Sequence, residues 1–231
     1  MSIQGGPFSI HDSSLVLSIN AANTKSYISG STNWADLSGN NLNGTLTNGP
    51  AFNSSNNGTL QFDGVNDYVS FPTGFISTLT ASTFSVWFYW TDNSNWSRVF
   101  DFGTGTTYNM FLTPKNGGTG VLRFAITTSS GAGEQQINHV ALSLSNWYNV
   151  VVTMSGSAGN MYVNGTLVAS NNSMTNTPSS LGSTTQNYLG KSQYPDPYFA
   201  GNIASLLIYK KALTSSEILQ NYNTEKSRFG L

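Results

Sequence analysis

Short apolar segments separated by turn-forming residues recur about every 8–12 residues along most of this chain. Asn and Gly gather in the intervening turns, at positions 39–41, 43–44, 48–50 and 56–58. Segments interrupted this often are too short for most helices but long enough for β-strands. The spacing therefore predicts an all-β sandwich or barrel, and 231 residues suit a single domain of that class.

The clearest strand is residues 84–90, which read Phe-Ser-Val-Trp-Phe-Tyr-Trp. Apolar side chains occupy both alternating faces, which predicts a central strand covered on both sides. Asn164-Gly165 predicts a tight hairpin, because both turn residues need a positive φ. Trp87, Trp90 and Trp147 are expected in the core. Further strands are expected at 15–18, 60–62, 68–71, 97–102, 108–113, 121–127, 137–142, 147–154, 187–190 and 201–209.

One short helix is predicted near the end of the chain. Thr214 and Glu217 form a capping-box pattern, and Ile218, Leu219 and Tyr222 supply an apolar stripe. A helix this short is not stable alone in water, so we expect it to dock on the sandwich.

Composition excludes several classes of function. Charged residues make up only 8% of the chain, with nine Lys and Arg against ten Asp and Glu. No basic stripe is present that would neutralise nucleic-acid phosphates, and no apolar run approaches the roughly 20 residues of a membrane-spanning helix. The lack of cysteine excludes disulfides, thiol nucleophiles and cysteine metal sites. We therefore expect neither a nucleic-acid partner nor a membrane.

The expected organisation is an N-terminal arm at 1–14, one domain at 15–223 and a tail at 224–231. No internal repeat or charge run divides the chain. No Lys or Arg precedes Lys25, so the basic region of a secretory signal is missing. This favours a protein that is already processed, stays in the cell that makes it, or leaves that cell as part of a particle.

Six stretches of the chain stand in a familiar order, at residues 34–46, 60–69, 84–88, 146–153, 161–165 and 201–209, followed by Ala212-Leu213-Thr214 and Glu217-Ile218. Together they resemble the laminin-G-like, concanavalin A-like jelly-roll superfamily. The resemblance implies a two-sheet antiparallel jelly-roll sandwich. The family usually has an acidic residue after the Ile of the last strand, where this chain has Ala204, which weakens a polar role at that position.

The flanks, Gly5-Gly6-Pro7, residues 15–27 and residues 218–231, resemble phage and marine-virus structural proteins that carry this domain. This narrower resemblance implies a virion component, as a capsid decoration, head-fibre or tail-associated protein on the virion surface. Its partners would be capsid or tail proteins, further copies of itself and host surface glycans. The alternative is a lectin-like module of a bacterial surface protein, located extracellularly or at the cell surface.

Enzyme activity is not expected. Retaining glycoside hydrolases need two carboxylates flanking the scissile bond, and the Glu-x-Asp-x-x-Glu pattern of the family's glucanases is absent. The glutamates are Glu134, Glu217 and Glu225 alone. His11 lies in the arm and His139 is a lone histidine in an expected strand, so no serine triad is indicated.

No cofactor is required, but calcium is a candidate, because it binds oxygen ligands in loops. Asp63, Asn66 and Asp67 offer three, and several laminin-G-like relatives bind calcium at sandwich edges. The alternative is that these residues only form the turn, and we favour it.

Sugar binding would use exposed aromatic side chains beside polar groups. The candidates are Trp96, Tyr108 and the loop Tyr194-Pro-Asp-Pro-Tyr198, which contributes Tyr194, Asp196 and Tyr198. Pro195 and Pro197 stiffen this loop, which lowers the entropy cost of presenting its tyrosines. The alternative is that these aromatics cover the sandwich or touch a neighbouring chain.

Overall fold

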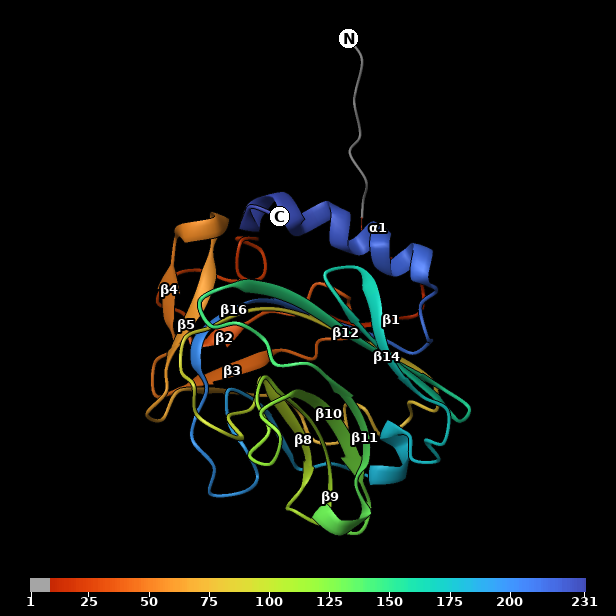
Figure 1. Cartoon of the computed structure of the whole chain (residues 1–231). Helices are drawn as coiled ribbons and strands as arrows, with labels where there is room; N and C mark the ends of the chain where they lie inside the picture. The colour runs from red at the N-terminus through yellow and green to blue at the C-terminus, as the bar shows by residue number, and fades with distance from the viewer. Residues whose placement is uncertain (1–8) are drawn as a thin grey trace.

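Two antiparallel β-sheets pack face to face, and a single α-helix lies across the outer face of one of them, in the computed structural model of residues 9–231 (Figure 1). Sheet A holds, in spatial order, β14 (Thr166–Asn171), β13 (Ala158–Val163), β12 (Trp147–Ser155), β7 (Ser82–Trp90), β16 (Ala200–Tyr209), β5 (Thr59–Asp63) and β4 (Ala51–Asn53), with β1 (Leu15–Asn20) also paired to β16. Sheet B holds β11 (Gln135–His139), β10 (Leu122–Thr127), β9 (Tyr108–Thr113), β8 (Phe100–Thr104), β15 (Gln186–Leu189), β6 (Tyr68–Ser70), β3 (Gly44–Thr47) and β2 (Asn33–Trp34). The predicted all-β jelly-roll sandwich is confirmed.

Strand β7 is the central strand that its sequence predicted, because it lies between β12 and β16. Phe84, Val86 and Phe88 are fully buried between the two sheets. Trp87 points to the outer face and is only 3% exposed, because Tyr222 and Phe229 cover it with ring centroids at 5.6 and 4.3 Å.

The local signals for a hairpin and a helix are also confirmed. Asn164 and Gly165 join β13 to β14 with φ values of 51° and 79°. Helix α1 (Ser215–Glu225) begins with the complete capping box: the Glu217 backbone N–H donates to Thr214 Oγ1, and the Thr214 N–H donates to the Glu217 carboxylate. Short 3-10 helices, η1 (Ser55–Asn57), η2 (Gly131–Gly133), η3 (Pro178–Leu181) and η4 (Lys226–Phe229), complete the described elements.

Several sequence expectations need correction. Strands β2, β3 and β4 were not expected. Gly44 opens β3, which pairs with β2 and β6, rather than forming a turn. A glycine suits this position because a Cβ there would lie 2.7 Å from Val69. The strand expected at 97–102 begins only at Phe100. The strand expected at 137–142 ends at His139, where its pairing with β10 ends. Trp147 is only half-buried and lies on the outer face of sheet A.

Residues 9–14 and 224–231 both pack on the side of sheet A. The Ile10 N–H donates to Asn221 Oδ1 at 2.7 Å, and the Tyr209 hydroxyl donates to the Ile10 carbonyl at 2.9 Å. Residues 1–8, which include Gly5-Gly6-Pro7, lie outside the described residues. The domain boundaries after residues 14 and 223 stay predictions. Within residues 9–231, no helix combines the length and apolarity that a membrane crossing requires.

Candidate functional site

Three loops meet over the outer face of sheet B and enclose a cavity of about 230 Å³. They are residues 91–99 after β7, residues 128–134 between β10 and β11, and residues 190–199 before β16. The cavity, called here the Trp96 pocket, is lined by Trp96, Arg98, Gly131, Glu134, Tyr194 and Asp196. It therefore brings together three of the five predicted sugar-binding residues.

The remaining two predicted sugar-binding residues lie outside this lining. Tyr108 begins β9 and is 44% exposed. Tyr198 is half-buried near the end of the loop before β16. Neither side chain lines the Trp96 pocket.

Arg98 is the charged group at the base of the pocket. Its side chain is only 3% exposed, and its guanidinium lies 3.9 Å from the centre of the Phe111 ring. Its Nη2 is 3.2 Å from Asp196, its Nε is 3.6 Å from Asp101, and Nη1 donates to the Trp96 carbonyl at 2.8 Å. The charge of Arg98 is thus already shared between two carboxylates, one of which lines the pocket.

Asp101 points outward from β8, because its neighbours Phe100 and Phe102 point into the core. It is fully buried and accepts hydrogen bonds from the Gln193 N–H at 3.1 Å, the Gln193 side chain at 3.0 Å and the Asn109 amide at 3.2 Å. These bonds tie the 190–199 loop to sheet B and so position Tyr194 and Asp196.

Trp96 adopts a backbone conformation that bulky residues rarely take, with φ at 66°. Its indole packs against Gly117, where a Cβ would lie only 2.2 Å from the indole nitrogen. The guanidinium carbons of Arg98 and Arg123 lie 5.3 and 5.4 Å from the centre of the ring. Strained residues of this kind cluster at binding sites, and the packing holds the ring in a fixed position.

The remaining wall is polar. Glu134 is 3.3 Å from Arg123 Nη1 and accepts a hydrogen bond from Gln136 at 3.0 Å. The Tyr194 hydroxyl donates to the Thr106 carbonyl at 3.1 Å. Burial raises the pKa of Tyr194, and the negative charges of Glu134 and Asp101 raise it further, so this phenol stays neutral.

Arg98 and Glu134 were not among the sites predicted from sequence. The sequence indicates a role for Arg98 only weakly: it is one of only nine Lys and Arg residues, and it stands directly before the apolar Val99-Phe100. A charged residue in such a segment is buried only when it has partners, but those partners lie on loops distant in sequence.

Asp101 gives the stability of the fold a pH dependence of definite sign. Burial raises the pKa of Asp101 from 3.8 to about 6, although Arg98 and the hydrogen-bond donors oppose this shift. Between pH values of about 4 and about 6, the folded protein therefore holds a proton that the unfolded chain has lost. We expect the contribution of Asp101 to the free energy of unfolding to fall by on the order of 1–3 kcal/mol as pH rises through this window.

Urea unfolding of the wild type and of Asp101→Asn across this pH range measures that contribution. The variant cannot titrate at this position, so its free energy of unfolding should lack that decrease. An identical pH profile in both proteins would show that Asp101 does not hold the proton.

The predicted calcium loop is a hydrogen-bonded turn. Asp63 Oδ1 accepts from the backbone N–H groups of Val65 at 2.8 Å and Asn66 at 3.2 Å, and Asp67 Oδ2 accepts from the Asp63 N–H at 3.0 Å. Among residues 9–231, no three His, Cys, Asp or Glu side chains gather as a metal site. The turn accounts for both carboxylates, and calcium binding at Asp63, Asn66 and Asp67 stays a prediction.

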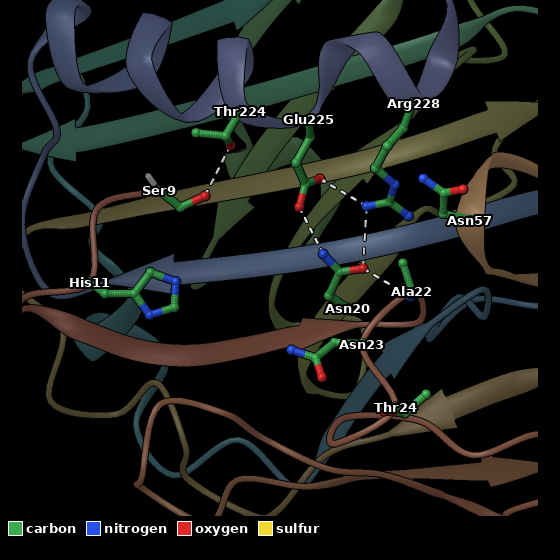
Figure 2. Close-up of a pocket in the computed structure, with 10 residues that line it drawn as sticks. All are labelled: Ser9, His11, Asn20, Ala22, Asn23, Thr24, Asn57, Thr224, Glu225 and Arg228. Carbon is green, nitrogen blue, oxygen red and sulfur yellow. Dashed lines mark hydrogen bonds and ion pairs between the residues drawn. The ribbon is translucent and has the colours of Figure 1, made fainter. Parts of the chain in front are cut away.

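A larger cavity, of about 860 Å³, lies on the side of sheet A between the N-terminal segment and the end of α1 (Figure 2). Glu225 accepts hydrogen bonds from Asn20 at 2.8 Å and Ser205 at 3.1 Å, and it lies 3.5 Å from Arg228. Arg228 donates to the Asn56 and Gly58 carbonyls, both at 3.1 Å. Because the charged groups bind protein neighbours and no Trp, Tyr or Phe lines the cavity, we assign this network to anchoring the end of α1.

Residues 63–219 match the family model described as the concanavalin A-like lectin/glucanases superfamily. No curated protein matches the chain. Among solved structures, domain 4 of AbnA, a GH43 extracellular arabinanase from Geobacillus stearothermophilus, solved with arabinotriose, superposes with a TM-score of 0.72 at 20% identity, covering 90% of this chain and 98% of that one.

Two further similar structures are larger than this chain. The botulinum neurotoxin serotype D/C binding domain has a TM-score of 0.70 at 16% identity, with 93% of this chain and 53% of that chain covered. Trypanosoma rangeli sialidase, solved with 2,3-difluorosialic acid, has a TM-score of 0.67 at 15% identity, with 94% and 34% covered. The chain thus spans about half of the toxin domain and a third of the sialidase, and these likenesses establish the fold alone.

Proposed function

The chain belongs to the concanavalin A-like lectin/glucanases superfamily, and on that premise we propose that it is a non-enzymatic carbohydrate-binding module that holds a neutral sugar in the Trp96 pocket. The observation that carries the proposal is that Trp96 from one loop meets Tyr194 and Asp196 from another at one cavity. Aromatic faces bind the apolar face of a sugar ring, while carboxylates accept hydrogen bonds from its hydroxyls.

The charges around the pocket favour a neutral ligand. Arg98 is paired with Asp101 and Asp196, and Arg123 is paired with Glu134, so the two arginines beside the Trp96 ring are already neutralised. An acidic sugar would meet the carboxylates of Glu134 and Asp196, and like charges repel. The arabinanase domain solved with arabinotriose is consistent with a neutral ligand, whereas the sialidase was solved with a sialic acid derivative.

Hydrolysis is not part of the proposal. Glu134 and Asp196 both face arginines, Glu217 caps α1, and Glu225 is buried in the network at the end of that helix. Glycoside hydrolysis needs two carboxyl groups that flank the scissile bond, whereas each of these four is engaged by ion pairs or hydrogen bonds with its protein neighbours.

Titration calorimetry with arabinotriose, xylotriose, maltotriose, lactose and sialyllactose tests this proposal. We expect at least one neutral sugar to bind, and sialyllactose to bind at least about tenfold more weakly than that sugar. Asp196→Asn should narrow this difference, because it removes a repelling charge and releases Arg98. Asp12→Asn changes the net charge by the same amount on the opposite side of the molecule, so it should leave the ratio of the two sugar affinities unchanged. Binding of none of the neutral sugars, or a preference for sialyllactose, would contradict the proposal.

A virion role is the second candidate. One observation favours attachment through the chain ends: residues 9–14 and 224–231 pack on sheet A, with the Ser9 and Thr224 hydroxyls 3.0 Å apart, whereas the Trp96 pocket opens on sheet B. A capsid, a tail or a bacterial surface protein holding that side would leave the pocket exposed. Quantitative mass spectrometry of purified particles from the source tests this: a copy number near that of the coat protein supports the virion surface, and absence contradicts it.

A further inference from the structure

A second cavity, of about 280 Å³, lies on the outer face of sheet A, on the opposite side of the sandwich from the Trp96 pocket. It is called here the Tyr89 cleft and is lined by Asn53, Ser55, Asn56, Thr59, Tyr89, Trp147 and Asn202. All of these residues are described by the structure, and none of them carries a charge. Because Trp147 was expected in the core, the sequence did not indicate this cleft.

The pairing of the strands explains how the floor of the cleft forms. Trp147 of β12 is directly opposite Tyr89 of β7, and Tyr89 is directly opposite Asn202 of β16. These three side chains therefore form one row across three neighbouring strands, on the face opposite the core residues Phe88 and Ile203. A row built on central strands is a rigid platform.

The aromatic pair in this row has a fixed geometry. The ring centroids of Tyr89 and Trp147 are 5.5 Å apart with an interplanar angle of 48°. Trp147 also packs on Phe229, at 4.4 Å between centroids. Because Trp147 is held by Phe229 and remains half-buried, it can offer an apolar surface without a large loss of entropy on binding.

The amide side chains beside the rings retain unused hydrogen-bonding groups. Asn202 donates through Nδ2 to Thr59 at 3.0 Å, and Asn56 donates through Nδ2 to the Arg228 carbonyl at 2.6 Å, which leaves the amide oxygen of each free of partners among residues 9–231. Asn53 accepts from the Ser55 N–H at 2.9 Å, which leaves its amide NH₂ to donate. The cleft thus combines apolar rings with uncharged donors and acceptors, which is the complement of a neutral sugar ring.

We propose that the Tyr89 cleft is a second binding site for a neutral sugar, independent of the Trp96 pocket. The two sites open on opposite sheets, so one molecule carries two sugar sites that face away from each other. Such a molecule can bridge two polysaccharide chains that lie on opposite sides of it.

Fluorine NMR of the full chain labelled with 5-fluorotryptophan tests this proposal, because Trp96 and Trp147 report on different cavities while Trp34, Trp87 and Trp90 are buried. Trp96→Phe and Trp147→Phe assign the two signals. Titration with the same four neutral sugars should move the Trp147 signal, and Trp96→Ala should leave that movement intact. Tyr89→Leu and Asn202→Ala should each weaken the Trp147 response by about tenfold without affecting the Trp96 response.

The outcomes separate the two proposals. If only the Trp96 signal moves and the Trp147 signal is unchanged at millimolar sugar, the second site is overturned and the proposed function stands. Movement of the Trp147 signal alone supports the second site and contradicts the Trp96 pocket. If Asn202→Ala unfolds the protein, the Tyr89→Leu variant alone tests the second site. This variant breaks no hydrogen bond within residues 9–231, because the Tyr89 hydroxyl has no partner there. Equal weakening of both signals by Tyr89→Leu would also overturn an independent site.

Discussion

Replacing Trp96 by Ala will weaken the binding of a neutral sugar by about 30-fold while the sandwich stays folded. Truncation of a tryptophan at the centre of a binding site typically costs about 2 kcal/mol, which corresponds to that factor. The indole is fixed by Gly117 and by two guanidinium groups, so the variant loses a preformed surface rather than a mobile side chain. Titration calorimetry measures the affinity, and thermal unfolding followed by circular dichroism checks the fold.

Two controls separate the ring from its strained backbone. Trp96→Gly removes the same ring but suits the φ of 66°, so an equal loss of binding in both variants assigns the effect to the ring. Tyr108→Ala removes an exposed aromatic side chain outside the pocket and should leave the affinity unchanged. Unchanged binding in Trp96→Ala, or an equal loss in Tyr108→Ala, would place the sugar elsewhere.

Replacing Trp87 by Ala will lower the free energy of unfolding by about 3–5 kcal/mol, the usual cost of removing a buried tryptophan. Trp87 is the surface on which the C-terminal segment docks: Phe229 stacks on it at 4.3 Å, Tyr222 lies parallel to it at 5.6 Å, and Ala204 is buried in the same cluster. Loss of this side chain leaves a cavity under η4 and α1. Urea unfolding measures the loss of stability.

The same variant should also release the end of the chain. Lys226 and Arg228 are trypsin sites within η4, so trypsin should cut the Trp87→Ala variant there faster than it cuts the wild type. Leu219→Ala alters a 46% exposed residue of α1 and should change stability by no more than about 0.5 kcal/mol. A loss below about 1 kcal/mol in Trp87→Ala, or no change in cleavage, would mean that Arg228 and Glu225 hold this segment without the rings.

Most of the strands could be predicted from sequence because their signals are local. Two-residue periodicity depends only on neighbours, so the apolar faces of residues 84–90 predicted the central position of β7. The Asn164-Gly165 turn and the Thr214 capping box are likewise complete within four residues. Strands β2 and β4 are only two and three residues long, which is too short for any periodicity to register.

The binding surfaces depend on contacts between distant parts of the chain. Residue type alone indicated Trp96, Tyr194 and Asp196, but only the antiparallel pairing of β8 with β9 and β15 brings their loops together around Arg98. The exposure of Trp147 was likewise decided by the register of β12 on β7 and by where η4 ends. Residue order along the chain thus determines the strands, the helix and their buried faces. Cross-strand register and the docking of the C-terminal segment decide which aromatic rings remain open to a ligand. The sequence alone does not show this, because register and docking depend on partners many residues away.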